Sequence, residues 1–298
     1  MNRYFLIFCC VFLFENFTFS QEINPRECDY RKADSIALSI PKGKKYSVDE
    51  LTNVLTKDLK TDHEKCRVIF RWITENIAYS FSNKTGDVTK VLQKRTAVCM
   101  GYAALFETMC RKAGLECETI AGFAKIAPED IGVKLTKTNH NWNVIKLYGK
   151  WYLIDATWAA GNYNHKFVKD YDESYYLTAP IYLILSHYPE DPKYQYLDTI
   201  ISSETFIRYP IVYSGLMKNK MILKTIPEGK LKKELRVQFT TTTTVSNIYG
   251  MFDGDKVSTP LEYTSNNSDH SVVYKLPFMT KGNYTFFVNG KAVFGFKK

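Results

Sequence analysis

The chain has 298 residues, of which 45% are apolar, and its 40 Lys and Arg outnumber its 31 Asp and Glu to give a formal net charge of +9 at pH 7. This length and apolar content are enough to bury one or two sizeable cores. They exclude an intrinsically disordered or repetitive protein.

The first twenty residues are typical of a secretory signal peptide. Arg3 supplies a short positive region, Tyr4 to Phe14 form an apolar run, and Thr18-Phe19-Ser20 offers a small-residue cleavage site before Gln21. The apolar run is 11 residues long, whereas a membrane-spanning helix needs roughly 18. We therefore expect an exported protein, periplasmic or extracellular, with no transmembrane segment after cleavage.

Residues 21–60 are predicted to form an N-terminal helical segment that packs on the core of the protein. Two short helical patterns are separated by Pro41-Lys42-Gly43, and the second begins at Ser47 with Glu50 three residues later. That spacing is typical of a capping box, in which the two residues satisfy backbone N–H groups at the start of a helix.

The segment from Ala97 to Ala113 is predicted to be a helix that carries a candidate nucleophile. Gly114 follows as a stop, and the apolar residues repeat at helical spacing: Val98, Tyr102, Leu105, Phe106 and Met109. Cys99 falls in the first turn, where the helix dipole and unpaired backbone N–H groups favour a thiolate over a thiol. The same N–H groups can hold the oxyanion of a tetrahedral intermediate.

Residues 140 to 155 are predicted to form a β-hairpin that carries a base and an acid. An alternating apolar run follows His140, a tight turn is centred on Gly149, and a second run ends at Asp155. His140 and Asp155 lie at comparable distances from the turn, so we expect them to touch as a cross-strand pair. A thiol needs a base to take its proton, and the base needs an acid to orient it. Cys99, His140 and Asp155 therefore predict a cysteine acyl-transfer site.

Two tryptophans lie near these residues in the sequence. Trp142 shares a strand face with His140 and can shield the imidazole from water, and Trp158 can close the cleft or offer an indole N–H. Core packing is the plainer interpretation of both. The remaining histidines fall outside any motif and are expected at the surface or in caps: His63, His165, His187 and His270.

Five cysteines remain after the expected cleavage: Cys28, Cys66, Cys99, Cys110 and Cys117. An odd number in an oxidising compartment leaves at least one free thiol, as a nucleophile requires. We interpret Cys66, Cys110 and Cys117 as small buried hydrophobes, although a Cys110–Cys117 or a Cys28–Cys66 bridge stays open. The sequence has no C-x-x-C or H-x-x-x-H spacing, so we expect neither a metal nor a cofactor.

The order and surroundings of the three candidate residues resemble those of a known family. With Cys at a helix start, His on a strand and Asp after the next strand, the chain resembles the transglutaminase-like superfamily, and more narrowly its kyphoscoliosis-peptidase-type bacterial branch. The supporting motifs, found between about Asp29 and Pro210, are Lys65–Ile73 followed by Asn76–Tyr79, Gly101-Tyr102-Ala103, Ala113–Cys117, Gly161 and Tyr188–Pro192.

The resemblance implies an α+β fold of the transglutaminase-like/papain-like cysteine proteinase type, with a catalytic domain over residues 61–214 whose last part wraps the core. It also implies an oxyanion-hole side chain at Gln93, six residues before Cys99.

From residue 215 to residue 298 the sequence predicts short strands with polar turns, including a hairpin turn at Asn289-Gly290. We interpret this part as a small all-β, immunoglobulin-like sandwich domain. It holds 13 Lys and Arg against 6 Asp and Glu, a net charge of +7. Such a domain can dock on an anionic cell-envelope surface, and a solvated lysine surface is an equally good interpretation. The lysines are dispersed and match no recognised nucleic-acid module, so we expect no nucleic-acid partner.

Two hypotheses about function follow. The first is an exported cysteine-dependent enzyme that transfers an acyl group from protein or peptide amides, as a peptidase or amidase when water accepts the group and as a transglutaminase when a lysine does. The second is a catalytically silent scaffold or binding module at the cell envelope. The complete set of thiol, imidazole and carboxylate favours the enzyme.

Overall fold

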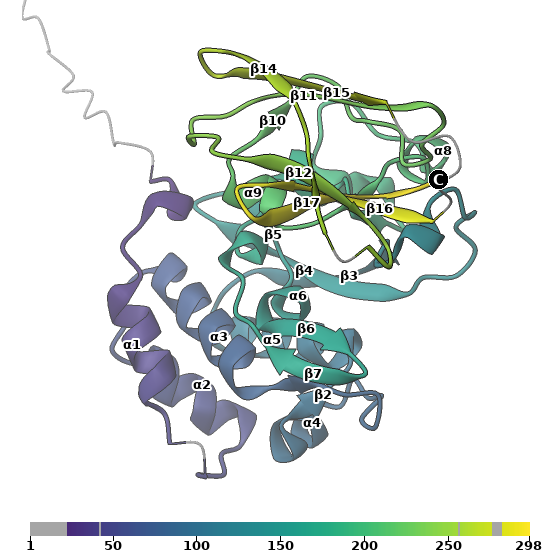
Figure 1. Ribbon diagram of the computed structural model, residues 1–298. Coiled ribbons are helices and arrows are strands. Elements are labelled where there is room, and N and C mark those ends of the chain that lie inside the picture. Colours follow the sequence, from purple (N-terminus) through teal and green to yellow (C-terminus); the bar gives the residue numbers. More distant parts are fainter. Residues whose placement is uncertain (1–22, 42, 256, 276–281) are drawn as a thin grey trace, which may run out of the picture.

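The computed structural model describes residues 23–298 except 42, 256 and 276–281, so the predicted signal peptide lies outside the described residues. Helices surround one four-stranded sheet in the N-terminal part, and two further sheets form the C-terminal part (Figure 1). A membrane-crossing helix would have to be long and apolar, and the described residues contain none of that kind.

Three helices begin the described chain: α1 (Arg31–Ser39), α2 (Val48–Thr56) and α3 (Asp62–Asn76). The predicted capping box of α2 is confirmed, because the Glu50 N–H donates to Ser47 Oγ at 3.2 Å and the Ser47 N–H donates to Glu50 Oε2 at 2.8 Å. Each helix contributes fully buried side chains to one common core, among them Ala37, Leu51 and Trp72. The residues before α3 therefore share the core of the residues that follow.

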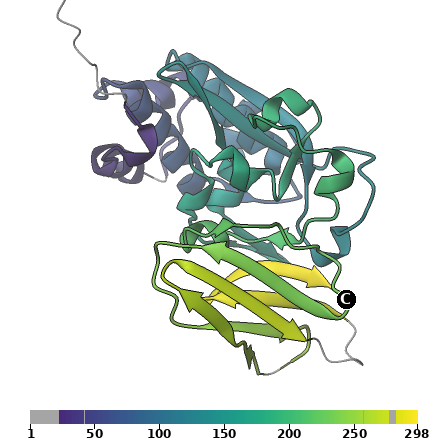
Figure 2. The ribbon, with the colours of Figure 1, turned by 90° about the horizontal axis from the view of Figure 1, so that it is seen from above.

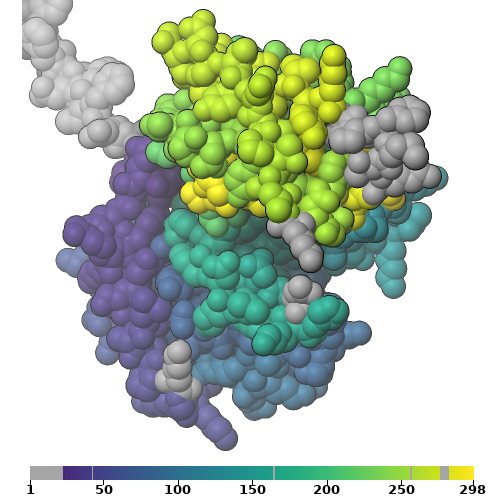
Figure 3. Space-filling view, viewed as in Figure 1, coloured from purple at the N-terminus to yellow at the C-terminus, as the bar shows by residue number. Residues whose placement is uncertain are grey.

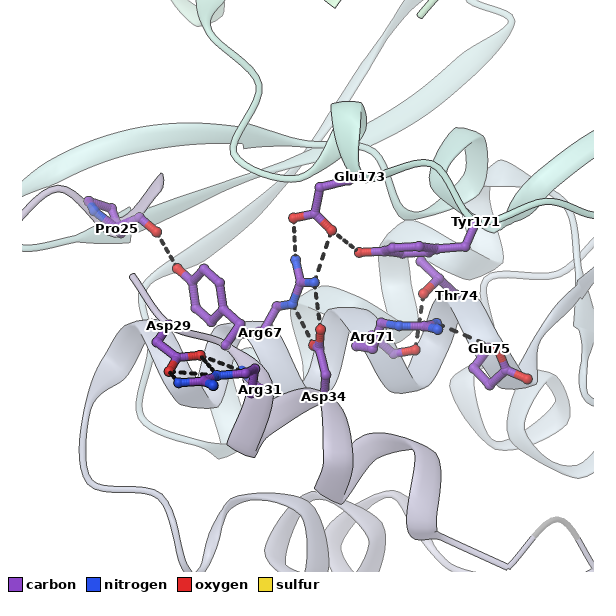
Figure 4. Close-up of polar contacts among 11 residues, drawn as sticks. Pro25, Asp29, Arg31, Asp34, Arg67, Arg71, Thr74, Glu75, Tyr171 and Glu173 are labelled. Atoms are coloured by element: carbon purple, nitrogen blue, oxygen red, sulfur yellow. Dashed lines mark hydrogen bonds and ion pairs between the residues drawn. The ribbon is translucent and has the colours of Figure 1, made fainter. Parts of the chain in front are cut away.

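A buried arginine joins the N-terminal helices to a distant loop (Figure 4). Arg67 on α3 donates from Nε to Asp34 Oδ1 of α1 at 2.6 Å and from Nη2 to Glu173 Oε2 at 2.9 Å. The rings of Tyr30 and Tyr176 lie 4.9 and 4.8 Å from its guanidinium carbon. Burial alone would lower the pKa of Arg67, but the hydrogen bonds to the two carboxylates raise it. The guanidinium therefore stays charged and clamps the two segments together.

The central sheet is antiparallel throughout and has the order β5-β4-β3-β8. The predicted hairpin is confirmed: Leu147 pairs with Lys150, and the two-residue turn between them, Tyr148-Gly149, has positive φ at both positions. The helix that carries Cys99, α5, packs against β4 and buries Tyr102 and Phe106. The strands of this sheet are β3 (Cys117–Ala124), β4 (His140–Leu147), β5 (Lys150–Ile154) and β8 (His187–Pro189), and α5 spans Cys99–Lys112.

Short elements complete the N-terminal part. The parallel pair β1-β2 and the antiparallel hairpin β6-β7 flank the start of α5 and the end of β5. Gly161 ends α6 with φ +148°, and a Cβ there would lie 2.2 Å from the Val168 carbonyl oxygen, so only glycine lets the hairpin fold back this closely. These elements are β1 (Ala78–Tyr79), α4 (Val88–Lys94), β2 (Thr96–Ala97), α6 (Ala156–Ala160), β6 (Gly161–Asn164), β7 (Lys166–Lys169), α7 (Pro180–Leu183) and α8 (Ser203–Phe206).

The C-terminal part consists of two antiparallel sheets that share one core (Figure 2). Phe239 and Val272 from the first sheet and Phe286 and Phe294 from the second are completely buried in this core. The first sheet has the order β10 (Ile222–Leu223), β11 (Glu234–Thr240), β15 (Asp269–Lys275), β14 (Tyr263–Asn266). The second has the order β13 (Thr259–Pro260), β12 (Ile248–Phe252), β16 (Asn283–Val288), β17 (Lys291–Lys297), β9 (Ile211–Val212).

The hairpin turn predicted at Asn289-Gly290 is confirmed, because Val288 pairs with Lys291 across it. The expected boundary between residues 214 and 215 does not separate the two sheets from the rest, since Ile211 pairs with Gly295 of β17 and α9 (Gly215–Lys218) packs on that strand. Strand β9 therefore belongs to the C-terminal sheets although it precedes the boundary. The immunoglobulin-like character of this part stays a prediction.

Candidate active site

Cys99 is the first residue of α5, as expected from the sequence. The backbone around it is crowded: a Cβ on Gly101 would lie 2.7 Å from the Cβ of Ala97 and 2.8 Å from the Thr85 carbonyl oxygen. A glycine two residues after the cysteine therefore lets the helix start directly against the preceding loop. The Gly101 N–H of this first turn already donates to the Val98 carbonyl at 2.9 Å, so the N–H groups of Cys99 and Met100 are those left without an acceptor in the helix and available to an anion.

A buried amide fixes α5 against the strand that carries His140. Asn143 on β4 is 1% exposed, and its Nδ2 donates to the Ala103 carbonyl on α5 at 3.1 Å and interacts with Thr119 Oγ1 on β3 at 3.1 Å. This cross-link and the apolar packing of α5 on β4 bring the start of the helix to the start of the strand. As a result Cys99 lies close enough to His140 for the imidazole to lower the pKa of the thiol and for the sulfur to help raise the pKa of the imidazole.

His140 and Asp155 lie diagonally rather than directly opposite each other. The register pairs Asn143 with Ile154, where β5 ends, and Asp155 is the N-cap of α6. The two side chains share one face of the hairpin, and His140 Nε2 lies 2.6 Å from Asp155 Oδ2. The expected contact is therefore present, but the expected direct cross-strand pairing is wrong, because the register set by the Tyr148-Gly149 turn places Asp155 across from Trp142, two residues closer to the turn than His140.

Asp155 has a hydrogen-bond partner on each side of its carboxylate. Oδ1 accepts the backbone N–H groups of Thr157 at 2.8 Å and Trp158 at 3.0 Å, the capping bonds of α6. Oδ2 meets Nε2 of His140 at 2.6 Å and Nε2 of His187 at 3.0 Å. Because an ionised carboxylate only accepts, both imidazoles donate to it.

These contacts shift the pKa of each group in a consistent direction. Burial alone would raise the pKa of Asp155, but His140 and then His187 lower it, so the carboxylate is ionised. Burial lowers the pKa of His140, yet the charge and hydrogen bond of Asp155, followed by those of Cys99, raise it to about 9. Burial raises the pKa of Cys99, but the hydrogen bond and charge of His140 and the Asn141 N–H outweigh it and lower the pKa. The arrangement therefore favours a thiolate beside an imidazolium.

His187 lies at the centre of the site, so its expected place at the surface or in a cap is wrong. It is 1% exposed and is the first residue of β8, the edge strand that pairs with β3. From this strand its side chain reaches Asp155, which follows the strand at the opposite edge of the sheet, β5. No spacing rule connects it with the other residues, because 32 residues separate it from Asp155. The one clue in the sequence is its position directly before the Tyr188–Pro192 motif.

The two tryptophans enclose the imidazoles. Trp142 is 1% exposed and stacks on His140 with ring centres 6.0 Å apart, while Trp158 lies 5.7 Å from His140 and 4.3 Å from His187. Trp142 is thus both a core residue and a wall of the imidazole. Gln93 is exposed on α4, whose buried residues are Val91 and Leu92, and it is not among the residues that line the cavity, so its role in an oxyanion hole stays a prediction.

A cavity of about 470 Å³ opens beside His140. One wall holds Tyr79, Phe81 and Tyr163, whose rings contact one another edge to face, and Phe81 and Tyr163 are 52% and 45% exposed. Burial and the nearby Cys99 raise the pKa of Tyr79 to about 12, which places this wall close to the sulfur, although Cys99 itself does not line the cavity.

The opposite wall of the cavity includes residues 211–214, so the C-terminal sheets border the site. Figure 3 shows the surface hollowed on this side, between the teal β6-β7 hairpin and the green and yellow C-terminal part. The cavity is therefore open to solvent and large enough for a peptide side chain and its backbone.

His140, Asp155 and His187 also form a group of three metal-ligand types, with their ligand atoms within 4.8 Å of one another. The hydrogen bonds already account for this closeness, because both Nε2 atoms are directed at the same carboxylate oxygen. Two N–H donors on one carboxylate oxygen explain this arrangement without a cation. All five cysteines among the described residues are free thiols, so neither of the two bridges left open by the sequence is formed.

Curated relatives include the human kyphoscoliosis peptidase, which is 32% identical over 208 residues and aligns with 66% of this chain and 31% of its own length. Hillarin of Drosophila melanogaster is 29% identical over 62% of this chain and 25% of its own length. The chain thus spans between a quarter and a third of these relatives. A solved structure of a TGase covers 49% of this chain and 36% of its own at 14% identity and a TM-score of 0.30, too distant to bear on the fold.

Residues 49–156 match the family model described as the transglutaminase-like superfamily. The matched range holds Cys99, His140 and Asp155. This match places residues 49–156 in the transglutaminase-like superfamily.

Proposed function

We propose that the chain is a cysteine-dependent acyl-transfer enzyme that acts on protein or peptide amides. The observation that carries this proposal is the hydrogen bond of 2.6 Å between His140 Nε2 and Asp155 Oδ2, with Cys99 at the start of α5 near the imidazole and an open cavity beside His140. A silent scaffold has no use for a thiol with a lowered pKa beside an imidazole with a raised one. The contact and the open cavity therefore favour the enzyme over the scaffold.

In the proposed reaction the Cys99 thiolate attacks the amide carbonyl carbon, and the carbonyl π-electrons move onto oxygen. The first-turn N–H groups of α5 are in a position to stabilise this oxyanion. When the C–N bond breaks, His140 gives its proton to the leaving amine and a thioester on Cys99 remains. Asp155 keeps the imidazole of His140 oriented throughout, because it accepts the Nε2 proton while Nδ1 is left for the sulfur.

The thioester is then released by water or by an amine, with His140 accepting the proton of the attacking group. We favour water, since the cavity beside His140 is open and two of its aromatic rings are half exposed to solvent. Hydrolysis makes the protein a peptidase or amidase, and transfer to a lysine makes it a transglutaminase.

The test is a screen of a peptide-amide library with mass-spectrometric detection, with and without a primary amine. Cleavage or amine incorporation by the wild type that is lost in Cys99→Ala supports the proposal. Cys28→Ala is the matched control, because Cys28 is a half-buried thiol away from the site and its loss should change nothing. No turnover by the wild type, or equal turnover by Cys99→Ala, would reject the enzyme and leave the scaffold.

We further propose that the protein acts outside the cytoplasm, on the basis of the signal peptide predicted in its sequence. The net charge of +7 on residues 215–298 supports docking of this part on an anionic envelope surface close to the substrate. Cell fractionation of the full-length protein tests the location. Binding to anionic and neutral vesicles at two salt concentrations tests the docking, since an electrostatic contact weakens as salt rises.

A further inference from the structure

We infer that His187 is a positioning residue of this site, which holds the Asp155 carboxylate in the one orientation that meets His140. The inference rests on the proposed function, because it assigns a role in orienting the Cys99–His140 pair. It adds a residue outside the range 49–156 that the family model matches.

The first step of the argument is the shared oxygen. Asp155 Oδ2 receives Nε2 of His140 at 2.6 Å and Nε2 of His187 at 3.0 Å, while Oδ1 receives two backbone N–H groups. The side chain of Asp155 is 0% exposed, so water does not replace a lost donor. Without His187 the carboxylate keeps one partner on Oδ2 in place of two, and its rotation about the terminal bond is less restricted.

The second step is the tautomer of His187. Its Nδ1 lies 2.8 Å from Ser186 Oγ, and the backbone N–H of Lys125 holds the Ser186 carbonyl at 3.1 Å. Burial lowers the pKa of His187, and although the hydrogen bond to Asp155 raises it, burial together with the charge of His140 prevails, so the ring is neutral. A neutral ring with its proton on Nε2 accepts the Ser186 hydroxyl at Nδ1. The ionised carboxylate of Asp155 therefore keeps the proton of His187 on Nε2, and the Ser186 hydroxyl, which also lies 3.4 Å from the Leu183 carbonyl, supports this tautomer when it donates to Nδ1.

The third step is that His187 does not meet substrate. It is 1% exposed, and it lies between Trp142, with ring centres 5.2 Å apart, and Trp158, at 4.3 Å. It is not among the residues that line the 470 Å³ cavity. Any effect of His187 on Cys99 must therefore pass through Asp155 and His140.

The test is the pH profile of alkylation of Cys99 by iodoacetate, an anionic reagent that needs both the thiolate and the neighbouring imidazolium. His187→Phe keeps a ring between the tryptophans and removes the donor, whereas His187→Gln keeps an N–H donor. We expect His187→Phe to lower the maximal rate on the order of tenfold, and to move the basic limb of the profile below its wild-type position. His187→Gln should restore most of the alkylation rate and most of the position of the basic limb. Ser186→Ala should lower the alkylation rate less than His187→Phe does, with an unchanged melting temperature.

A profile of His187→Phe that superimposes on the wild type overturns the inference, and so does an equal loss in the Phe and Gln variants. A second measurement separates this result from a failure of the proposed function. In a Cys99→Ala background, NMR titration of His140 should give a lower pKa with His187→Phe than with His187, whether or not the enzyme has a substrate. An unchanged pKa of His140 overturns the inference even if turnover is found.

Discussion

Replacing Asp155 by Asn tests the electrostatic arrangement of the site with the smallest change in shape. The carboxylate contributes most to raising the pKa of His140 from 6.5 to about 9, against the opposing effect of burial. A shift of this size corresponds to about 3 kcal/mol in favour of the imidazolium. Asp155→Asn removes the charge, so the imidazolium loses most of this stabilisation.

The amide also imposes the wrong tautomer on His140. Its oxygen is needed to accept the Thr157 and Trp158 N–H groups, so its NH₂ faces the two imidazoles. His140 must then accept at Nε2 and carry its proton on Nδ1, the nitrogen that should take the proton of Cys99. Loss of charge and loss of tautomer together predict a fall in acyl transfer by a factor on the order of 10³ to 10⁴.

The assay is again the iodoacetate profile, followed by turnover once a substrate is known. For the wild type we expect a bell-shaped plot of alkylation rate against pH, in which the rate falls on the basic side near pH 9 as His140 loses its proton. For Asp155→Asn the basic limb should move below pH 6.5 and the acid limb should rise, because Cys99 loses its charged partner. No pH range then holds both the thiolate and the imidazolium in quantity, so the maximal alkylation rate should be low at every pH. A variant that keeps the wild-type bell and turnover would refute the reasoning.

Three further predictions concern the residues that support the site. Gly122→Ala would place a Cβ 2.4 Å from both the Trp142 ring and the Tyr188 carbonyl oxygen; it should lower stability by about 2 kcal/mol in urea denaturation and slow Cys99 alkylation. Arg67→Met removes the guanidinium that pairs with Asp34 and Glu173, and both carboxylates are partly exposed to water. The free energy of unfolding in urea should fall by about 2 kcal/mol, and the iodoacetate profile should stay unchanged. Lys125→Met removes the ammonium that three carbonyls between residues 206 and 210 accept, and should lower the melting temperature in calorimetry by several degrees, whereas Lys125→Arg should lower it less.

Local rules predicted those parts of the molecule that depend on local chemistry. The capping box at Ser47, the turn at Gly149 and the start of a helix at Cys99 each follow from a few adjacent residues, and each is present. His140 and Asp155 were predicted to meet because a hairpin brings its two strands together whatever the rest of the chain does. The place of Cys99 beside them depends on the packing of α5 on β4.

The remaining features depend on tertiary packing, which local patterns do not encode. Asp155 lies diagonal to His140 because the register places it across from Trp142, and a shift of two residues in register is of the kind that sequence places poorly. His187 reaches Asp155 only because the chain between residues 155 and 187 returns to the other edge of β3.

Competitive alkylation of Cys99 and Cys28 by iodoacetamide at pH 7 tests the central claim most directly. Both thiols are half buried, but burial and nearby Glu27 raise the pKa of Cys28, whereas His140 lowers that of Cys99. Each unit by which the pKa of Cys99 lies below that of Cys28 gives Cys99 a tenfold larger thiolate fraction at this pH. The lower nucleophilicity of the more acidic thiolate offsets part of this gain in rate. We predict that Cys99 reacts more than about tenfold faster, and that His140→Ala abolishes the difference. Equal rates in the wild type, or a difference that survives His140→Ala, would contradict the account.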